Sequence, residues 1–198
     1  MNSFAYSVFF TIFIFLYSVY RLHTTFFLKT DRKKNIQMKE LYTLWLLTIV
    51  HSLIILTTVI EYFYINKHKN INLLVSFIGI LTFLLSLALR HISIKTLREQ
   101  FSYNIEILVE HKLIRDGIYR YMRHPIYLGT ILELVSFPLV GNAYYSFFAS
   151  IIFYMPLLGL RLFLEEKALI AKFGEEYLQY KKETPILWPQ IRKRKIIK

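Results

Sequence analysis

Charged residues are absent from three long apolar stretches of the chain, and this pattern predicts transmembrane helices. The stretches are residues 3–20, 41–60 and 71–89. Each contains no Asp, Glu, Lys or Arg and is close to the roughly 20 residues that a helix needs to cross a bilayer. We expect the first stretch to remain as an anchor, because no basic residue precedes it and no small-residue cleavage site follows it.

A fourth apolar stretch, residues 125–160, is long enough for two shorter spans that fold into a hairpin. Gly141-Asn142 marks the expected turn, and Glu133 is the only charged residue in the stretch. At a rise of about 1.5 Å per residue, each half just crosses or nearly crosses the bilayer. The pattern therefore predicts an all-α integral membrane protein with about five transmembrane helices.

The net charge is +12, and the distribution of Lys and Arg along the chain indicates membrane topology rather than a nucleic-acid-binding surface. Residues 21–40, 90–123 and 161–198 carry six, seven and ten Lys and Arg residues, whereas the loop at 67–69 carries two. Because cytoplasmic loops are enriched in Lys and Arg, the N-terminus is predicted outside and the C-terminus in the cytoplasm. The expected partner is the lipid bilayer, whose anionic headgroups attract such a face, and no nucleic acid is expected.

Polar residues lie at both ends of the predicted hairpin, and folding should bring them together on the cytoplasmic side. Arg123 and His124 come directly before Pro125, which suits the first turn of a helix. Arg161 and Glu165 follow the hairpin, four residues apart, so they share a helix face. Taken alone, this pair is an ordinary surface ion pair worth about 0.3–0.5 kcal/mol. Its convergence with the first cluster favours a functional site.

Two polar residues lie inside the predicted spans, and no metal centre is expected from the remaining pattern. Glu133 either pairs with a cation from a neighbouring helix or lines a substrate entrance. His51 is expected to form a hydrogen bond between helices. The chain has no cysteine, and its six histidines include no pair spaced three or four residues apart. No Gly-rich dinucleotide or phosphate-binding fingerprint is present. A Rossmann-type domain is excluded because the pattern offers no strands and helices to build one.

Several short motifs follow one another in the second half of the chain. They are His111-Lys112-Leu113-Ile114, Gly117-Ile118-Tyr119, Arg123-His124-Pro125-Ile126-Tyr127, Arg161 with Glu165-Glu166, and Phe173-Gly174-Glu175-Glu176-Tyr177 with Tyr180. In this order and spacing, residues 91–191 resemble the isoprenylcysteine carboxyl methyltransferase family of membrane enzymes that use S-adenosylmethionine. The Arg-His-Pro-x-Tyr motif alone is less specific, because related membrane methyltransferases and some sterol reductases carry a similar one.

The resemblance implies one membrane methyltransferase domain, residues 1–198, with three helices in 1–89 and the cofactor-binding catalytic half in 90–198. It implies a cytoplasmic pocket for S-adenosylmethionine, formed by the 90–124 segment and the C-terminal helix. The implied cofactor contacts are Asn104, His111, Lys112, Leu113, Ile114, Tyr119, His124, Pro125, Ile126, Tyr127 and Glu165. Arg161 and Glu165 are implied as the catalytic residues, and Arg161 as the one that meets the acceptor. At Asn104 the chain departs from the family, which usually has glutamine there.

The function implied is O-methylation of a lipophilic acceptor, a prenylated or acyl-chain small molecule or peptide. A carboxylate of an isoprenylcysteine-like or other lipidic substrate is the leading acceptor, because the planar fork of Arg161 suits a carboxylate that is already ionised. One alternative is methylation of a phenol or enol lipid, with His124 or Glu165 as base. Others are an NADPH-dependent membrane reductase of a sterol-like lipid and a structural membrane protein that binds anionic lipid.

Overall fold

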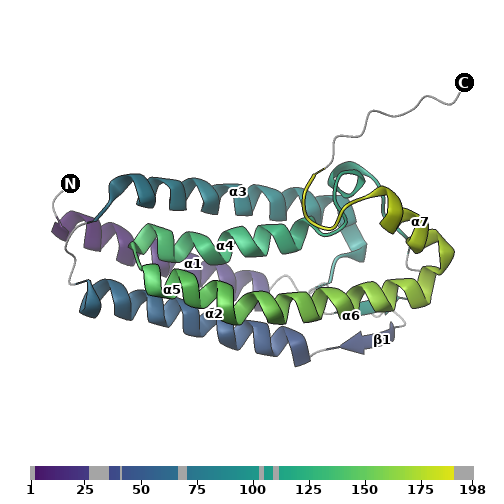
Figure 1. The fold of residues 1–198 in the computed structure, drawn as a ribbon, viewed down its shortest axis with the longest axis horizontal. Coiled ribbons are helices and arrows are strands. Elements are labelled where there is room, and N and C mark those ends of the chain that lie inside the picture. The colour runs from purple at the N-terminus through teal and green to yellow at the C-terminus, as the bar shows by residue number, and fades with distance from the viewer. Residues whose placement is uncertain are drawn as a thin grey trace, which may run out of the picture.

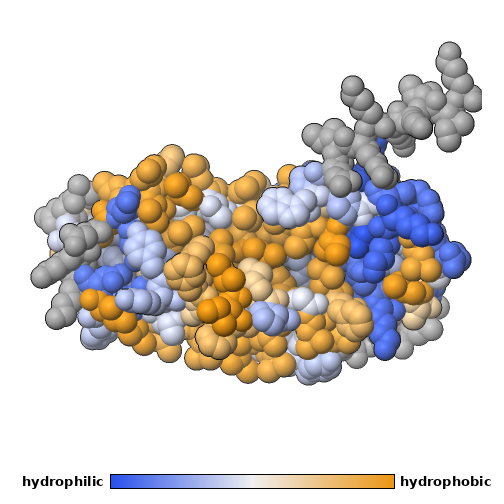
Figure 2. All heavy atoms as spheres, in the orientation of Figure 1, coloured by the Kyte–Doolittle hydropathy of each residue, from blue (hydrophilic) through white to orange (hydrophobic). Residues whose placement is uncertain are grey.

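Long apolar helices running roughly parallel make up most of the molecule in the computed structural model (Figure 1). The structure describes residues 3–26, 36–40, 42–66, 71–102, 105–108 and 112–189. Four of its helices are long and apolar enough to cross a membrane, and a shorter apolar helix accompanies them. Figure 2 shows the resulting apolar belt, with hydrophilic residues at both ends and the larger group of them around α7. The prediction of a helical membrane protein with about five spans is confirmed.

The helices follow the predicted boundaries closely in the first half of the chain. They are α1 (Ser3–Phe26), α2 (Tyr42–Ile60) with its π-helical extension η1 (Glu61–Ile65), α3 (Leu73–Leu97), α4 (Pro125–Gly141), α5 (Tyr144–Ala149), η4 (Ser150–Tyr154), α6 (Met155–Phe173) and α7 (Glu175–Glu183). Short 3₁₀ turns, η2 (Arg98–Gln100) and η3 (Gly117–Arg120), flank the loop before α4.

The fifth span is longer than the sequence suggested, because α5, η4 and α6 form one continuous helix from Tyr144 to Phe173. This helix does not end near residue 160, so Arg161 and the residues that follow it belong to the same helix. Pro156 lies just after the π-helical turn η4, which is the local adjustment expected where a proline removes a backbone donor. Gly174, with a φ of +53° that favours glycine, separates α6 from α7.

A two-stranded antiparallel sheet is a feature that the sequence analysis missed. Strand β1 (Ile36–Glu40) pairs with β2 (Ile105–Leu108), with Lys39 opposite Glu106. Both segments alternate apolar and polar residues over only four or five positions, and such short runs are easily taken for loops. The sheet joins the α1–α2 connection to the connection after α3. These two connections therefore lie at the same end of the bundle, as the charge pattern predicted.

Helices α3 and α4 pack at very close range because small residues line their interface. A Cβ added to Gly79 would lie only 2.7 Å from the backbone nitrogen of Val140. One added to Gly129 would lie 3.3 Å from the carbonyl oxygen of Ser86. Small residues at such positions let two backbones approach, which drives helix association where the hydrophobic effect is absent.

The hairpin turn between α4 and α5 is held by side chains from the other helices. Asn142 ends α4 in the left-handed conformation, and its side chain donates to the Ser76 hydroxyl and accepts from the Asn72 backbone. Glu61 accepts hydrogen bonds from the backbone N–H groups of Tyr145 and Ser146 at the start of α5. The predicted turn at Gly141-Asn142 is thus confirmed, and its partners satisfy backbone groups that would otherwise be unpaired.

A polar cluster inside the bundle joins four helices around Glu133, which is fully buried. Glu133 forms an ion pair with Arg90 of α3, and the guanidinium of Arg21 in α1 lies 3.6 Å from it. The Tyr17 hydroxyl donates to Glu133 and lies 2.6 Å from Nε2 of His51. Of the two alternatives for Glu133, the structure shows pairing with cations from neighbouring helices. The expected hydrogen bond of His51 between helices is confirmed.

Candidate active site

The motif around His124 lies where the chain enters α4, at the end of the bundle that carries α7 (Figure 1). Pro125 occupies the first turn of the helix, where its missing N–H breaks no hydrogen bond. The segment after α7 runs alongside, because the N–H groups of Arg123 and His124 donate to the carbonyls of Pro185 and Ile186. The entry to α4 is therefore enclosed by the C-terminal part of the chain.

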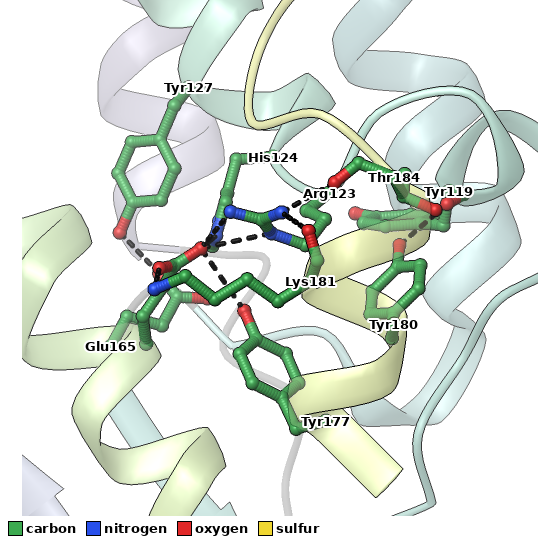
Figure 3. Close-up of polar contacts among 10 residues, drawn as sticks. Tyr119, Arg123, His124, Tyr127, Glu165, Tyr177, Tyr180, Lys181 and Thr184 are labelled. Carbon is green, nitrogen blue, oxygen red and sulfur yellow. Dashed lines mark hydrogen bonds and ion pairs between the residues drawn. The ribbon is translucent and has the colours of Figure 1, made fainter. Parts of the chain in front are cut away.

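Tyr127 and Glu165 meet directly, and they join α4 to α6. The Tyr127 hydroxyl donates to the Glu165 carboxylate, which is only partly buried (Figure 3). Arg161 lies one helical turn before Glu165, close enough for its positive charge to interact with the Tyr127 hydroxyl. Tyr127 comes from one sequence motif and Arg161 with Glu165 from another, and the fold brings the two motifs together.

Arg161 has a further partner that the sequence analysis did not single out. Its guanidinium donates to the hydroxyl of Thr43, at the start of α2, over 2.8 Å. Both side chains are buried, with Thr43 2% and Arg161 6% exposed. The first half of the chain thus contributes a polar residue to the site.

Glu166 differs from its neighbour Glu165, because it is buried and holds a separate set of partners. Arg123 donates to Glu166 from two nitrogens, over 3.0 and 2.7 Å, and the Lys181 ammonium lies 2.7 Å away (Figure 3). Nε2 of His124 lies 3.4 Å from the same carboxylate, and the Tyr177 hydroxyl also reaches it. His124 therefore faces Glu166 rather than Glu165.

The same cluster fastens α7 and the segment after it to the entry of α4. Arg123 also donates to the backbone carbonyls of Lys181 and Thr184 (Figure 3). One guanidinium thus bridges a carboxylate of α6, the end of α7 and the segment that follows. This arrangement indicates a role for Arg123 and Glu166 in holding the site in shape.

Tyr119 lies in this region with a buried hydroxyl that has no hydrogen-bond partner among the described residues. Its backbone carbonyl accepts a hydrogen bond from Tyr180, which ties η3 to α7 (Figure 3). Burial raises the pKa of the Tyr119 phenol well above its ordinary value, and the nearby charge of Glu165 adds to the shift. A neutral, unpartnered phenol in a buried position is suited to hydrogen-bond a ligand.

The remaining predicted contacts lie in or near the loop before η3. Lys112 is exposed, Leu113 and Ile114 are partly buried, and the Lys112 N–H donates to the side chain of Gln100. Asn104 and His111 lie outside the described residues, so their contacts stay predictions. Gln100, which sequence reasoning passed over, accepts this hydrogen bond and so contacts the segment at Lys112.

Ile126 is the one predicted contact in the His124–Tyr127 motif that is only partly buried. Pro125, His124 and Tyr127 are all buried around it. The roles assigned to these residues, and to the loop before η3, stay predictions, because burial alone does not identify a ligand contact.

These features define a helical membrane protein with a compact polar site at one end of its bundle. The model of the "Isoprenylcysteine carboxyl methyltransferase (ICMT) family" matches residues 77–171, which include α4, Arg161 and both glutamates. The resemblance to this family that the motifs indicated is thus confirmed over these residues.

Known proteins similar to this chain include two named methyltransferases. The "Protein-S-isoprenylcysteine O-methyltransferase" of Schizosaccharomyces pombe is 36% identical over 77 residues, which are 38% of this chain and 32% of that protein. The "Methanethiol S-methyltransferase" of Crocosphaera subtropica is 36% identical over 83 residues, 42% of this chain and 31% of that protein. The matched region thus spans about a third of the length of each of these relatives.

A solved structure supports the fold. The eukaryotic intramembrane Ras methyltransferase ICMT superposes with a TM-score of 0.53, over 76% of this chain and 53% of that one, at 21% sequence identity. At this identity the likeness concerns the fold alone. It agrees with an integral, multi-pass membrane protein.

Proposed function

We propose that this protein is an S-adenosylmethionine-dependent O-methyltransferase that acts on the carboxylate of an isoprenylcysteine-like or other lipidic acceptor. The observation that supports it best is the contact of Tyr127 with Glu165, one helical turn from Arg161. This contact joins two residues assigned to the cofactor, and Arg161, the residue assigned to the acceptor, lies on the same face of α6 as Glu165. A donor and an acceptor bound at these residues would lie side by side, which is the main requirement of a displacement reaction.

The residues present fit the chemical groups of S-adenosylmethionine. The Tyr119 hydroxyl is buried without a partner among the described residues, and the Glu165 carboxylate is partly open. A phenol can hydrogen-bond a hydroxyl or carboxylate of the cofactor, and a carboxylate can hold its ammonium group. We assign the cofactor to these two residues together with His124 to Tyr127 and residues 111–114.

When bound, the cofactor supplies a methyl group on a sulfonium: the acceptor oxygen bonds to the methyl carbon, and the C–S electron pair stays on the departing thioether. Arg161 would hold one carboxylate oxygen of the acceptor and leave the other free to attack. A carboxylate is already ionised at neutral pH, so no residue has to remove a proton. For a phenol or enol acceptor, His124 or Glu165 would have to act as base.

Calorimetry on the purified protein tests the cofactor assignment. S-adenosylmethionine should bind, and Glu165→Ala and His124→Ala should each weaken binding strongly. Full affinity in both variants would refute the site. Binding of NADPH in place of S-adenosylmethionine would favour the reductase alternative, and binding of neither would leave the structural, lipid-binding alternative.

The acceptor class needs its own comparison, because one similar protein is named as a methanethiol S-methyltransferase. N-acetyl-S-farnesylcysteine and methanethiol can be offered to the same preparation with labelled S-adenosylmethionine. We expect labelling of the prenylated carboxylate, since Arg161 suits a planar oxyanion and the apolar belt gives a lipid tail access from the side. If only methanethiol is labelled, the acceptor is a thiol and the proposed carboxylate acceptor is wrong.

The proposal treats residues 1–198 as one domain and places the site on the cytoplasmic side of the membrane. The pocket would lie between the 90–124 segment and the C-terminal helices. The distribution of Lys and Arg supports this orientation, with the N-terminus outside. In Figure 1 the start of α1 and helix α7 lie at opposite ends of the bundle, which agrees with an odd number of spans.

A further inference from the structure

Thr43 and Arg161 are in contact although they lie 118 residues apart in the sequence. Its hydroxyl accepts a hydrogen bond from Nη1 of Arg161 over 2.8 Å. Only 2% of Thr43 and 6% of Arg161 is exposed, so water does not compete freely for this bond. A hydrogen bond from a charged donor in such surroundings is stronger than one between neutral groups.

The packing of α2 keeps Thr43 at this place. Thr43, Leu47 and His51 lie on one face of α2, at spacings of four residues, and all three are buried. Leu47 belongs to one apolar cluster with Tyr127 of α4 and Leu158 of α6. Since Leu158 precedes Arg161 by three residues, this cluster fixes α2 against the turn of α6 that carries the guanidinium.

A guanidinium is planar, and its N–H donors are fixed relative to one another. A bond at Nη1 therefore limits the direction in which the other N–H groups point. The guanidinium also interacts electrostatically with the Tyr127 hydroxyl of α4. Thr43 contributes a neutral hydroxyl, which orients the guanidinium without adding a negative charge that would repel an anionic acceptor.

We propose that Thr43 is a positioning residue: its hydroxyl orients Arg161 toward the anionic head group of the lipophilic acceptor. Helix α2 would then form part of the acceptor side of the site and not only a membrane anchor. This inference rests on the proposed function. It concerns acceptor recognition alone, so binding of S-adenosylmethionine should not depend on Thr43.

The test compares three variants of the full-length protein in detergent, with N-acetyl-S-farnesylcysteine as acceptor. Thr43→Val keeps the shape but loses the hydroxyl, and Thr43→Ser keeps the hydroxyl. Thr58→Val is the matched control, because Thr58 is buried on the same helix and donates to its own helix at the carbonyl of Ile54.

We expect Thr43→Val to raise the KM for the acceptor about tenfold, as for loss of one hydrogen bond to a charged group. The Kd for S-adenosylmethionine should stay the same, Thr43→Ser should restore the KM, and Thr58→Val should behave as wild type. If Thr43 had only a structural role, Thr43→Val would lower the thermal stability and would weaken the binding of acceptor and cofactor together.

An unchanged acceptor KM in Thr43→Val would overturn the inference. Equal losses for acceptor and cofactor without rescue by serine would overturn it as well. In both cases wild-type transfer to the acceptor remains, so the proposed function stands. If the wild-type protein transfers no methyl group to this acceptor, the carboxylate proposal fails and the role of Thr43 fails with it.

Discussion

Glu165 and Glu166 are neighbours in sequence but have separate partners, so their substitution should separate ligand binding from stability. Glu166 is 5% exposed, and its carboxylate meets the equally buried guanidinium of Arg123. Glu166→Gln leaves that guanidinium buried without its anion, which should cost about 3 kcal/mol of stability. The pair with Lys181 adds roughly 0–1 kcal/mol, because that side chain is 41% exposed and solvent screens it.

Glu165→Gln is the matched variant at the preceding position. Its amide oxygen can still accept the hydrogen bond from Tyr127, and the side chain is only partly buried. We expect its stability to stay within about 1 kcal/mol of wild type. Loss of the charge should lower the affinity for S-adenosylmethionine at least tenfold, because a hydrogen bond to a charged group is worth about 1.5–3 kcal/mol.

Denaturant unfolding in detergent gives the stability of each variant, and calorimetry gives its affinity for S-adenosylmethionine. The two variants should show opposite patterns: stability lost in Glu166→Gln, affinity lost in Glu165→Gln with normal stability. Equal stability losses in both would refute the separate roles. So would a Glu166→Gln protein that is as stable as wild type.

Three further predictions follow from packing, titration and topology. Gly79→Ala should destabilise the protein by about 1–3 kcal/mol in denaturant unfolding, because its Cβ would collide with α4. Gly159→Ala, which meets nothing within 4 Å, should cause no loss. Burial raises the pKa of Tyr180 in the folded state. The neutral phenol should therefore contribute fully to stability below its ordinary pKa of 10.0, and this contribution should decline as the pH rises above 10.0. Tyr180→Phe should flatten this decline in a series of Tm measurements. In a chain without cysteine, Lys182→Cys should react with an impermeant thiol reagent only from the cytoplasmic side and Tyr145→Cys only from outside; the reverse labelling would invert the topology.

The helices could be predicted from the sequence because a bilayer imposes a simple length and polarity rule. Residues 3–20, 41–60 and 71–89 meet that rule by themselves, and Gly141-Asn142 marked the turn. The continuation of the last span through Arg161 could not be predicted, since charged residues look like a membrane boundary whether or not the helix ends there. The β1–β2 pair was missed because its strands are too short to show a period.

Part of the candidate site could be predicted from its motifs. Tyr127 and Glu165 were assigned to one pocket, and the structure brings them into contact. Thr43 carried no sequence signal, because a threonine at the start of an apolar helix is common and only the packing of α2 shows its partner. The different roles of Glu165 and Glu166 depend on which face of α6 each one occupies.

Transfer of labelled methyl from S-adenosylmethionine to N-acetyl-S-farnesylcysteine, measured in wild type and Arg161→Ala, tests the central claim most directly. The account predicts that wild type forms the methyl ester. It predicts that Arg161→Ala still binds S-adenosylmethionine but forms almost no ester. Wild-type protein that binds the cofactor yet labels no lipophilic acceptor, or an Arg161→Ala variant with normal transfer, would contradict it.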